Sequence, residues 1–242
     1  MREEIKYYLY NSPAFELFGL QHNLSIFVSL LLWVTLPLYF KKYSSKQTQN
    51  KVGITLGYIV MSNYLAWVVL EIAAGTFSLK LHLPFHLCRA ANILLPIVMI
   101  TRNQMIYDIV YFWGLSGMLQ GMFTPDITNA FPHFHFFRFW VGHNGLILAI
   151  LYATIVYKMR PSKKGIKRAF YALNLFLVIT TVINLILDSN YFWICGKPET
   201  ASLLDIMGPW PWYILTGELV ALLHFFIAYA PFWYRRKRLK AL

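Results

Sequence analysis

Apolar runs of about 18 to 24 residues recur along the whole chain, and they restrict the fold more than any other feature of the sequence. A run of this length, wound into a helix, is long enough to cross the hydrocarbon core of a bilayer. Seven runs are visible, at residues 20–40, 52–76, 84–101, 106–123, 138–158, 168–188 and 212–233. The pattern predicts an all-α fold, a polytopic membrane protein with a bundle of seven transmembrane helices.

Composition supports the same class of protein. Hydrophobic residues make up 58% of the 242 residues and charged residues only 13%, which are too few charges to cover a soluble globule of this size. We see no long linker and no internal repeat, so residues 1–242 are expected to form one domain. Residues 1–19 are expected to be an interfacial N-terminal segment, with 3–18 either amphipathic or a short disordered tail. No small-residue cleavage site follows the first apolar run, so it does not read as a signal peptide.

Basic residues flank alternate runs and so predict the orientation. They are Lys41, Lys42, Lys46 and Lys51 after the first run, Arg102 after the third, Lys158, Arg160, Lys163, Lys164, Lys167 and Arg168 after the fifth, and Arg235, Arg236, Lys237, Arg238 and Lys240 in the basic tail 234–242. The positive-inside bias places this side in the cytoplasm, with the N-terminus outside the cell membrane and the C-terminus inside. Because topology accounts for the net charge of +12, a nucleic-acid partner is excluded.

Most other ionisable residues gather at the opposite, outer end. They are Glu71, His82, His86, Cys88, Arg89, Arg138 and His143, and, between the last two runs, Asp188, Asn190, Cys195, Lys197, Glu199 and Asp205. A charge within a membrane costs roughly 2.5 to 3.5 kcal/mol on insertion scales, so such groups are usually functional or paired. Helical spacing aligns Asn63, Trp67 and Glu71 on one stripe, and Thr181, Asn184 and Asp188 on another. The stripes favour a polar funnel, although interhelical hydrogen bonding is the alternative.

The segment LPFHLCRAANILLP places a cysteine at the start of the third run. Pro84 suits the first turn of a helix, so the helix is expected to begin there and to hold Cys88 about one turn inside. Positions two apart on a helix point about 200° apart, so His86 and Cys88 cannot face the same reactant if both are helical. Asn92 can share the Cys88 face. A base for Cys88 must come from another helix, and His143 is the best candidate because it begins its own run at a similar depth.

Cys88 then has the setting of a nucleophile, because a helix N-terminus and nearby Arg and His side chains stabilise a thiolate. Three alternatives stay open: a small packing residue, a structural disulfide with Cys195, or a metal ligand. The possible ligands His82, His86, Cys88, His133 and His135 match no tight zinc spacing, so no metal and no cofactor is expected. A thiol redox role needs a C-x-x-C pair, which the sequence lacks.

Three motifs in order, LPFHLCRAANILLP, FWVGHNGLILAILY and NYFWICGKPETASLLDIMGPWPWYI, resemble the YwaF-like family of bacterial integral membrane proteins over most of residues 15–235. The animal relatives form the transmembrane protein 164 family, acyltransferases that act on ether phospholipids through a cysteine matching Cys88. A more remote resemblance is to the androgen-induced membrane hydrolases of fatty-acid esters. The resemblance implies a membrane fold with Cys88 as nucleophile and His143 as histidine partner.

These observations lead to the hypothesis of an enzyme, a membrane-embedded acyltransferase acting on phospholipids and lysophospholipids through a Cys88 thioester. Arg89 and Asn92 are candidates for stabilising the oxyanion, Lys197 and Arg138 for binding the lipid phosphate, and Trp210 for anchoring the loop at the outer interface. His86, Glu71, Asp188, Asn190 and Asp205 complete the supporting or substrate-binding set. A lipid hydrolase and a non-catalytic lipid-binding or transport protein remain alternatives, the last without the inverted repeats of many transporters.

Overall fold

The computed structural model describes residues 1–11, 13–199 and 202–240. Its regular elements are helices: α1 (Arg2–Tyr10), α2 (Leu20–Tyr43), α3 (Lys46–Ala74), α4 (Leu87–Thr101), α5 (Gln104–Trp113), η1 (Gly114–Met118), α6 (Leu119–Phe123), α7 (Phe134–Ile155), α8 (Lys163–Leu187), η2 (Tyr191–Trp193), η3 (Leu203–Ile206) and α9 (Trp212–Lys240). Within the described residues, extended pairing is limited to an isolated bridge between Ala14 and Asn129. The all-α expectation is confirmed.

Five of these helices are long and apolar enough to cross a membrane. They are Leu20–Tyr43, Lys46–Ala74, Phe134–Ile155, Lys163–Leu187 and Trp212–Arg236. The predicted run 84–101 corresponds to a shorter apolar helix, α4, of 15 residues. The run 106–123 corresponds to α5, η1 and α6 in succession. Each predicted run therefore contains a helix or several consecutive helices, and five of them meet the length and apolarity needed for a span.

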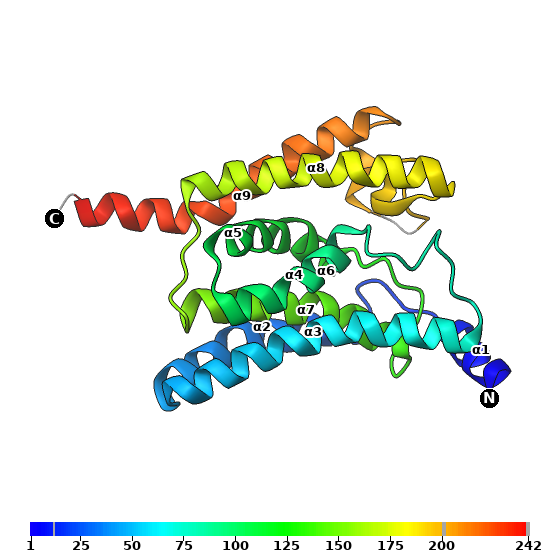
Figure 1. Ribbon diagram of the computed structural model, residues 1–242, viewed down its shortest axis with the longest axis horizontal. Coiled ribbons are helices and arrows are strands. Elements are labelled where there is room, and N and C mark those ends of the chain that lie inside the picture. The colour runs from blue at the N-terminus through cyan, green and yellow to red at the C-terminus, as the bar shows by residue number, and fades with distance from the viewer. Residues whose placement is uncertain (12, 200–201, 241–242) are drawn as a thin grey trace.

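Consecutive long helices alternate in direction and form three layers (Figure 1). One layer holds α2, α3 and α7, the middle one holds α4, α5 and α6, and α8 and α9 cover the other side. The α2–α3, α4–α5 and α7–α8 connections lie at the same end of the bundle as the end of α9, at the left of Figure 1. These segments carry the basic flanks, while the α3–α4 and α8–α9 connections lie at the opposite end.

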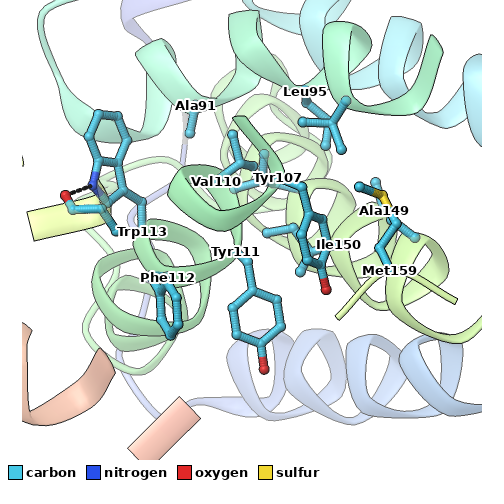
Figure 2. Close-up of a cluster of buried hydrophobic side chains, with 14 of the residues drawn as sticks. Ala91, Leu95, Tyr107, Val110, Tyr111, Phe112, Trp113, Ala149, Ile150 and Met159 are labelled. Carbon is cyan, nitrogen blue, oxygen red and sulfur yellow. Dashed lines mark hydrogen bonds between the residues drawn. The ribbon is translucent and has the colours of Figure 1, made fainter. Parts of the chain in front are cut away.

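The core is centred on α5, which is buried among α4, α7 and α8 (Figure 2). Tyr107 and Phe112 are fully buried, and the indole Nε1 of Trp113 donates to the carbonyl of Ala169 in α8 at 3.1 Å. Gly114 lets the next turn approach α7, because a Cβ there would lie 2.4 Å from Ile150 Cδ1. Gly114 therefore serves close helix packing.

The π-helix η1 was not predicted from the sequence. It continues directly from α5 and into α6, and π segments within helices occur frequently at functional sites. On η1, Gly117 faces Leu87 at the start of α4, and on α6 Gly121 faces His143 of α7. The irregular turn thus lies beside both helices that carry the candidate catalytic residues.

The N-terminal segment packs onto the end of the bundle that lies opposite the basic flanks. Leu9 of α1 is buried, and Arg2 Nε donates to the carbonyl of Ala74 at the end of α3 at 3.2 Å. Gly75 ends α3 with a left-handed φ of 70°, and its missing side chain leaves room for the Arg2 guanidinium. The expected interfacial segment 1–19 and basic tail 234–242 include residues 12 and 241–242, which lie outside the described residues. The part of the tail up to Lys240 continues α9.

Candidate functional site

Cys88 is the second residue of α4, nearer the helix terminus than predicted. The helix begins at Leu87, and the expectation that it starts at Pro84 is wrong. Residues 83–86 are held in a non-helical path, because Leu83 N donates to the Tyr191 hydroxyl and the Arg89 guanidinium donates to the Leu83 carbonyl, both at 3.0 Å. Cys88 therefore lies where the first backbone N–H groups of a helix have no intrahelical acceptor.

Two arginines meet at one tryptophan next to this cysteine. The guanidinium carbons of Arg89 in α4 and Arg138 in α7 lie 4.5 Å and 4.2 Å from the ring centre of Trp67 in α3. Both cations oppose the desolvation of the buried Cys88 sulfur, which is the larger effect. Positive charge at this position stabilises a thiolate, against the desolvation that burial of the thiol imposes. Sequence reasoning named both arginines and placed Trp67 on a polar stripe, but it did not predict their contact.

Asn92 connects the cysteine helix to the histidine helix. When its amide nitrogen faces the two nearby carbonyls, it donates to Cys88 O and Gly142 O at 3.2 Å each. Gly142 precedes His143, so α4 and α7 meet next to both candidate catalytic residues. An amide nitrogen occupied by two backbone carbonyls is not available to an oxyanion, so Asn92 acts here as a link between the two helices.

His143 is oriented by its own helix. Its Nδ1–H donates to the Phe139 carbonyl at 3.1 Å, and its ring stacks on Phe139 with 4.1 Å between ring centres. Nδ1 therefore carries the proton, and Nε2 is the proton acceptor. Nε2 faces α6, where it lies 3.6 Å from the position that a Cβ on Gly121 would take. Among the described residues, Cys88 and His143 share no hydrogen bond, so their predicted pairing stays a prediction.

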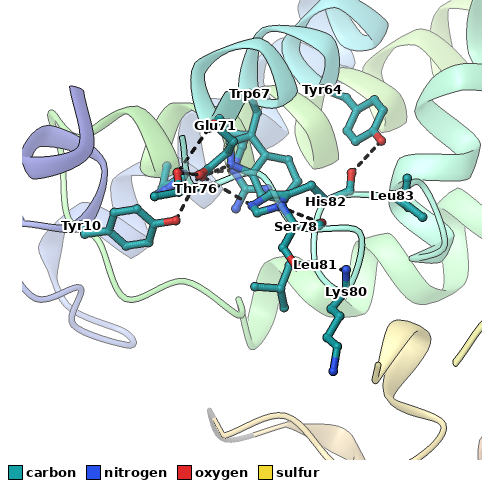
Figure 3. Close-up of polar contacts among 12 residues, drawn as sticks. Tyr10, Tyr64, Trp67, Glu71, Thr76, Ser78, Lys80, Leu81, His82 and Leu83 are labelled. Carbon is teal, nitrogen blue, oxygen red and sulfur yellow. Dashed lines mark hydrogen bonds and ion pairs between the residues drawn. The ribbon is translucent and has the colours of Figure 1, made fainter. Parts of the chain in front are cut away.

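Glu71 organises a buried polar network behind Trp67 (Figure 3). Its side chain accepts from the Trp67 Nε1–H at 2.8 Å, from the Tyr10 hydroxyl at 3.0 Å and from the Thr76 hydroxyl at 2.6 Å. His82 Nε2 lies 3.7 Å from the same carboxylate. In the predicted stripe of Asn63, Trp67 and Glu71, Asn63 forms an interhelical hydrogen bond: it donates to the Arg138 carbonyl of α7 at 2.8 Å. This is the alternative to the polar funnel.

His82 contacts Glu71 as a neutral ring. Burial lowers the pKa of His82, and Arg89 and Arg138 act in the same direction, while the Glu71 carboxylate opposes them. The net direction is downward, so the 3.7 Å contact is not a charged pair at neutral pH. His86 lies apart from this group, with its ring edge-on to Tyr191 and Trp193 at 5.5 Å and 4.9 Å.

Most of the remaining predicted site residues form contacts within the α8–α9 connection, and Asp188 contacts the α3–α4 connection. Asp188 is exposed and pairs with Lys80 at 2.9 Å. Asn190 Oδ1 accepts from Cys195 N at 2.9 Å, and Asp205 caps η3 through Ser202 N at 2.7 Å. Lys197 reaches the Asp205 carbonyl at 3.4 Å, and the Trp210 Nε1–H donates to the Ile194 carbonyl at 3.0 Å.

This connection reaches the α4 entrance through aromatic residues that sequence reasoning did not single out. Tyr191 bonds Leu83 N and donates to the Leu79 carbonyl at 2.7 Å, and it packs with Trp193 against His86. The second stripe was expected to line the same funnel. Asn184 of that stripe is instead buried: its amide donates to the Tyr191 carbonyl and accepts from the Tyr191 N–H. The polar groups of α8 position the loop.

Cys88 and Cys195 are both free thiols, Cys88 partly buried and Cys195 exposed. The disulfide alternative is therefore absent from this structure. Within the described residues, no three His, Cys, Asp or Glu side chains are grouped so that they could hold a metal ion.

Comparison with known proteins yields a family and one distant relative. The TMEM164 family model matches residues 17–229. An uncharacterized protein from Treponema pallidum (strain Nichols) is 25% identical over 227 residues, which cover 93% of this chain and 92% of the relative. No solved structure matches the chain.

Proposed function

The chain belongs to the TMEM164 family, and from that premise we propose that it is a multi-pass membrane acyltransferase that moves acyl chains between phospholipids and lysophospholipids. Cys88 carries the acyl group as a thioester. The observation that supports this most directly is the position of Cys88 in the first turn of α4, with Arg89 next to it in the chain. Unpaired N–H groups at a helix N-terminus also favour negative charge.

The reaction proceeds in two transfers. A base removes the Cys88 proton, and the sulfur attacks the ester carbonyl of the donor lipid. The carbon–oxygen ester bond breaks, the thioester forms, and the departing lysolipid alkoxide takes up the proton. An acceptor hydroxyl then attacks the thioester, gives its proton to the base, and restores the thiol. The developing oxyanion is stabilised by Arg89 and by the first N–H groups of α4.

His143 is the base in this proposal. Its free Nε2 has the correct tautomer for accepting a proton, because Nδ1–H is bonded to the Phe139 carbonyl. The Asn92 link to Gly142 holds α4 and α7 together one residue from it. Nε2 faces Gly121 in the unliganded protein, and catalytic contacts often form only when the substrate binds.

Seven membrane crossings complete the proposal, with the N-terminus outside and the C-terminus in the cytoplasm. The two runs outside the five long apolar helices, α4 and the α5–η1–α6 rod, lie between helices that are long enough to cross. The gathering of the basic flanks at one end of the bundle supports this orientation. Cys88 then lies near the outer leaflet of the cell membrane, at the depth of phospholipid ester carbonyls, about 15 Å from the bilayer centre.

The test is to incubate the purified full-length protein with a phospholipid labelled in its acyl chain and an unlabelled lysophospholipid. Transfer of label to the lysophospholipid is the expected result. Release of labelled free fatty acid with no transfer would identify a hydrolase of the same fold. Recovery of the labelled lipid unchanged but bound to the protein would contradict the enzyme and favour a binding or transport protein.

Cys195→Ala is expected to retain the transfer rate and the melting temperature of the original protein. The thiol is exposed and unpaired, and the loop around it is held by Asn190 through backbone N–H groups that the substitution leaves in place. Thermal unfolding in detergent and the transfer assay check this. A parallel loss of folding in Cys195→Ala and Cys88→Ala would point instead to a required disulfide.

A further inference from the structure

The guanidinium groups of Arg89 and Arg138 both lie against the indole ring of Trp67. Their guanidinium carbons lie 4.5 Å and 4.2 Å from the Trp67 ring centre, so the two positive charges lie close to each other. Within the described residues, neither guanidinium forms an ion pair, and the ion pairs present involve other basic groups. Glu71 and Asp126 act electrostatically on Arg138.

The hydrogen bonds of the two guanidinium groups leave donors unused. Arg89 uses NH1, which donates to the Leu81 and Leu83 carbonyls. Arg138 uses Nε, which donates to His135 Nδ1 at 3.2 Å. Among the residues that the structure describes, the two terminal nitrogens of Arg138 and Nε and NH2 of Arg89 have no acceptor. Guanidinium N–H groups pair preferentially with the oxygens of carboxylates and phosphates, in a fork of two parallel bonds.

The arrangement is held in place before any ligand binds. Trp67 is fixed by its bond to Glu71, which in turn accepts from Tyr10 and Thr76. Cation–π contacts with the ring lower the energy of each arginine, but two like charges near one ring also repel each other. A shared anion removes this repulsion, so the unliganded cluster favours an oxyanion with several acceptor oxygens.

We propose that Arg89 and Arg138, with Trp67 as their common support, bind the phosphate of the lipid headgroup. A phosphate diester offers two unesterified oxygens, one for each guanidinium, whereas the neutral esters of a phosphate-free lipid offer no charge. This assignment rests on the proposed function and extends it, because Arg89 is the chain neighbour of Cys88. A phosphate held here places the ester groups of the same lipid, only a few bonds away, beside the thiol.

The experiment measures binding without turnover. Full-length Cys88→Ala protein in neutral detergent micelles is titrated with dihexanoyl phosphatidylcholine, with dihexanoyl glycerol and with inorganic phosphate, and bound ligand is counted by native mass spectrometry. Adding Arg138→Gln or Arg89→Gln is expected to weaken phosphatidylcholine binding about tenfold or more, because each removes charge-assisted hydrogen bonds. Dihexanoyl glycerol binding is expected to be unchanged. Arg235→Gln is the matched control, because it removes an exposed positive charge at the opposite end.

Three binding results would overturn the assignment. One is equal phosphatidylcholine affinity with and without the arginines, and a second is an equal loss for dihexanoyl glycerol, which would indicate a general packing role. Competition by inorganic phosphate at the same concentration as the lipid would assign the site to free phosphate and also contradict a headgroup site. A loss of phosphatidylcholine affinity in the arginine variants, without competition by inorganic phosphate, supports it.

Further variants keep the test independent of folding and of catalysis. If Arg138→Gln lowers the melting temperature strongly, Arg138→Lys retains the charge without the fork and is expected to show an intermediate affinity. Because the protein used lacks the thiol, a failure of acyl transfer leaves the binding result intact. Conversely, an original protein that forms a thioester equally fast from phosphate-free donors would retain the proposed reaction and contradict the phosphate site.

Discussion

Cys88→Ala is expected to reduce acyl transfer by at least about a thousandfold, to the background rate. The substitution removes the sulfur that forms the thioester, and no neighbouring group replaces it: Cys195 is held in the α8–α9 connection by Asn190, and the side chain of Asn92 is engaged between α4 and α7. The effect belongs to the chemical step, so the transfer rate at saturating lipid should fall. The assay is transfer of a labelled acyl chain to a lysophospholipid.

Cys88→Ser provides the matched control, because it keeps the size and hydrogen-bonding capacity of the thiol but is a far weaker nucleophile without strong activation. Both variants should keep the melting temperature within a few degrees, since the thiol is only partly buried and forms no disulfide. Full transfer activity in Cys88→Ala with a native melting temperature would remove Cys88 from the mechanism.

Glu71→Ala is expected to lower the free energy of unfolding by about 1 to 3 kcal/mol. Glu71 is 1% exposed, and its removal leaves the Tyr10, Thr76 and Trp67 donors without their shared acceptor. It also removes the bond that orients Trp67 and detaches Tyr10 of α1 from α3. Chemical unfolding in detergent micelles measures the change, and limited proteolysis measures release of the N-terminal segment.

Glu71→Gln separates the loss of charge from the loss of shape. Its carbonyl oxygen can still accept from Trp67 Nε1, while its amide can donate to the Tyr10 and Thr76 hydroxyls, which are able to accept. We therefore expect a loss much smaller than in Glu71→Ala. Similar losses in the two variants would mean that the negative charge, and not the hydrogen-bond geometry, stabilises this end of the bundle.

Helix positions follow well from the sequence where apolar length decides them. The predicted run 20–40 became Leu20–Tyr43, and 168–188 became Lys163–Leu187, each longer than predicted because Lys and Arg side chains continue a helix beyond the hydrocarbon region. The start of α4 was wrong because the proline rule is local. At Pro84 the backbone follows bonds from Tyr191 and Arg89, and nothing near Pro84 in the sequence indicates the Tyr191 contact.

The candidate site shows the same limit. Helical spacing placed Trp67 and Glu71 on one face, and their hydrogen bond confirms it. The convergence of Arg89 and Arg138 on Trp67 depends on packing among α3, α4 and α7, which periodicity does not give. Asp188, Lys197 and Asp205 were assigned to the site only because they are polar or charged and lie at the outer end. Their contacts instead stabilise the α8–α9 connection. Shared depth is therefore weaker information than shared contacts.

Intact-protein mass spectrometry after mixing the purified protein with native lipids shows whether Cys88 carries an acyl group. We expect an added acyl mass on the original protein, removed by hydroxylamine as expected for a thioester, and no added mass on Cys88→Ala. An acyl mass that persists on Cys88→Ala, or transfer activity on the original protein with no acylated species trapped at any time, would contradict a Cys88 thioester.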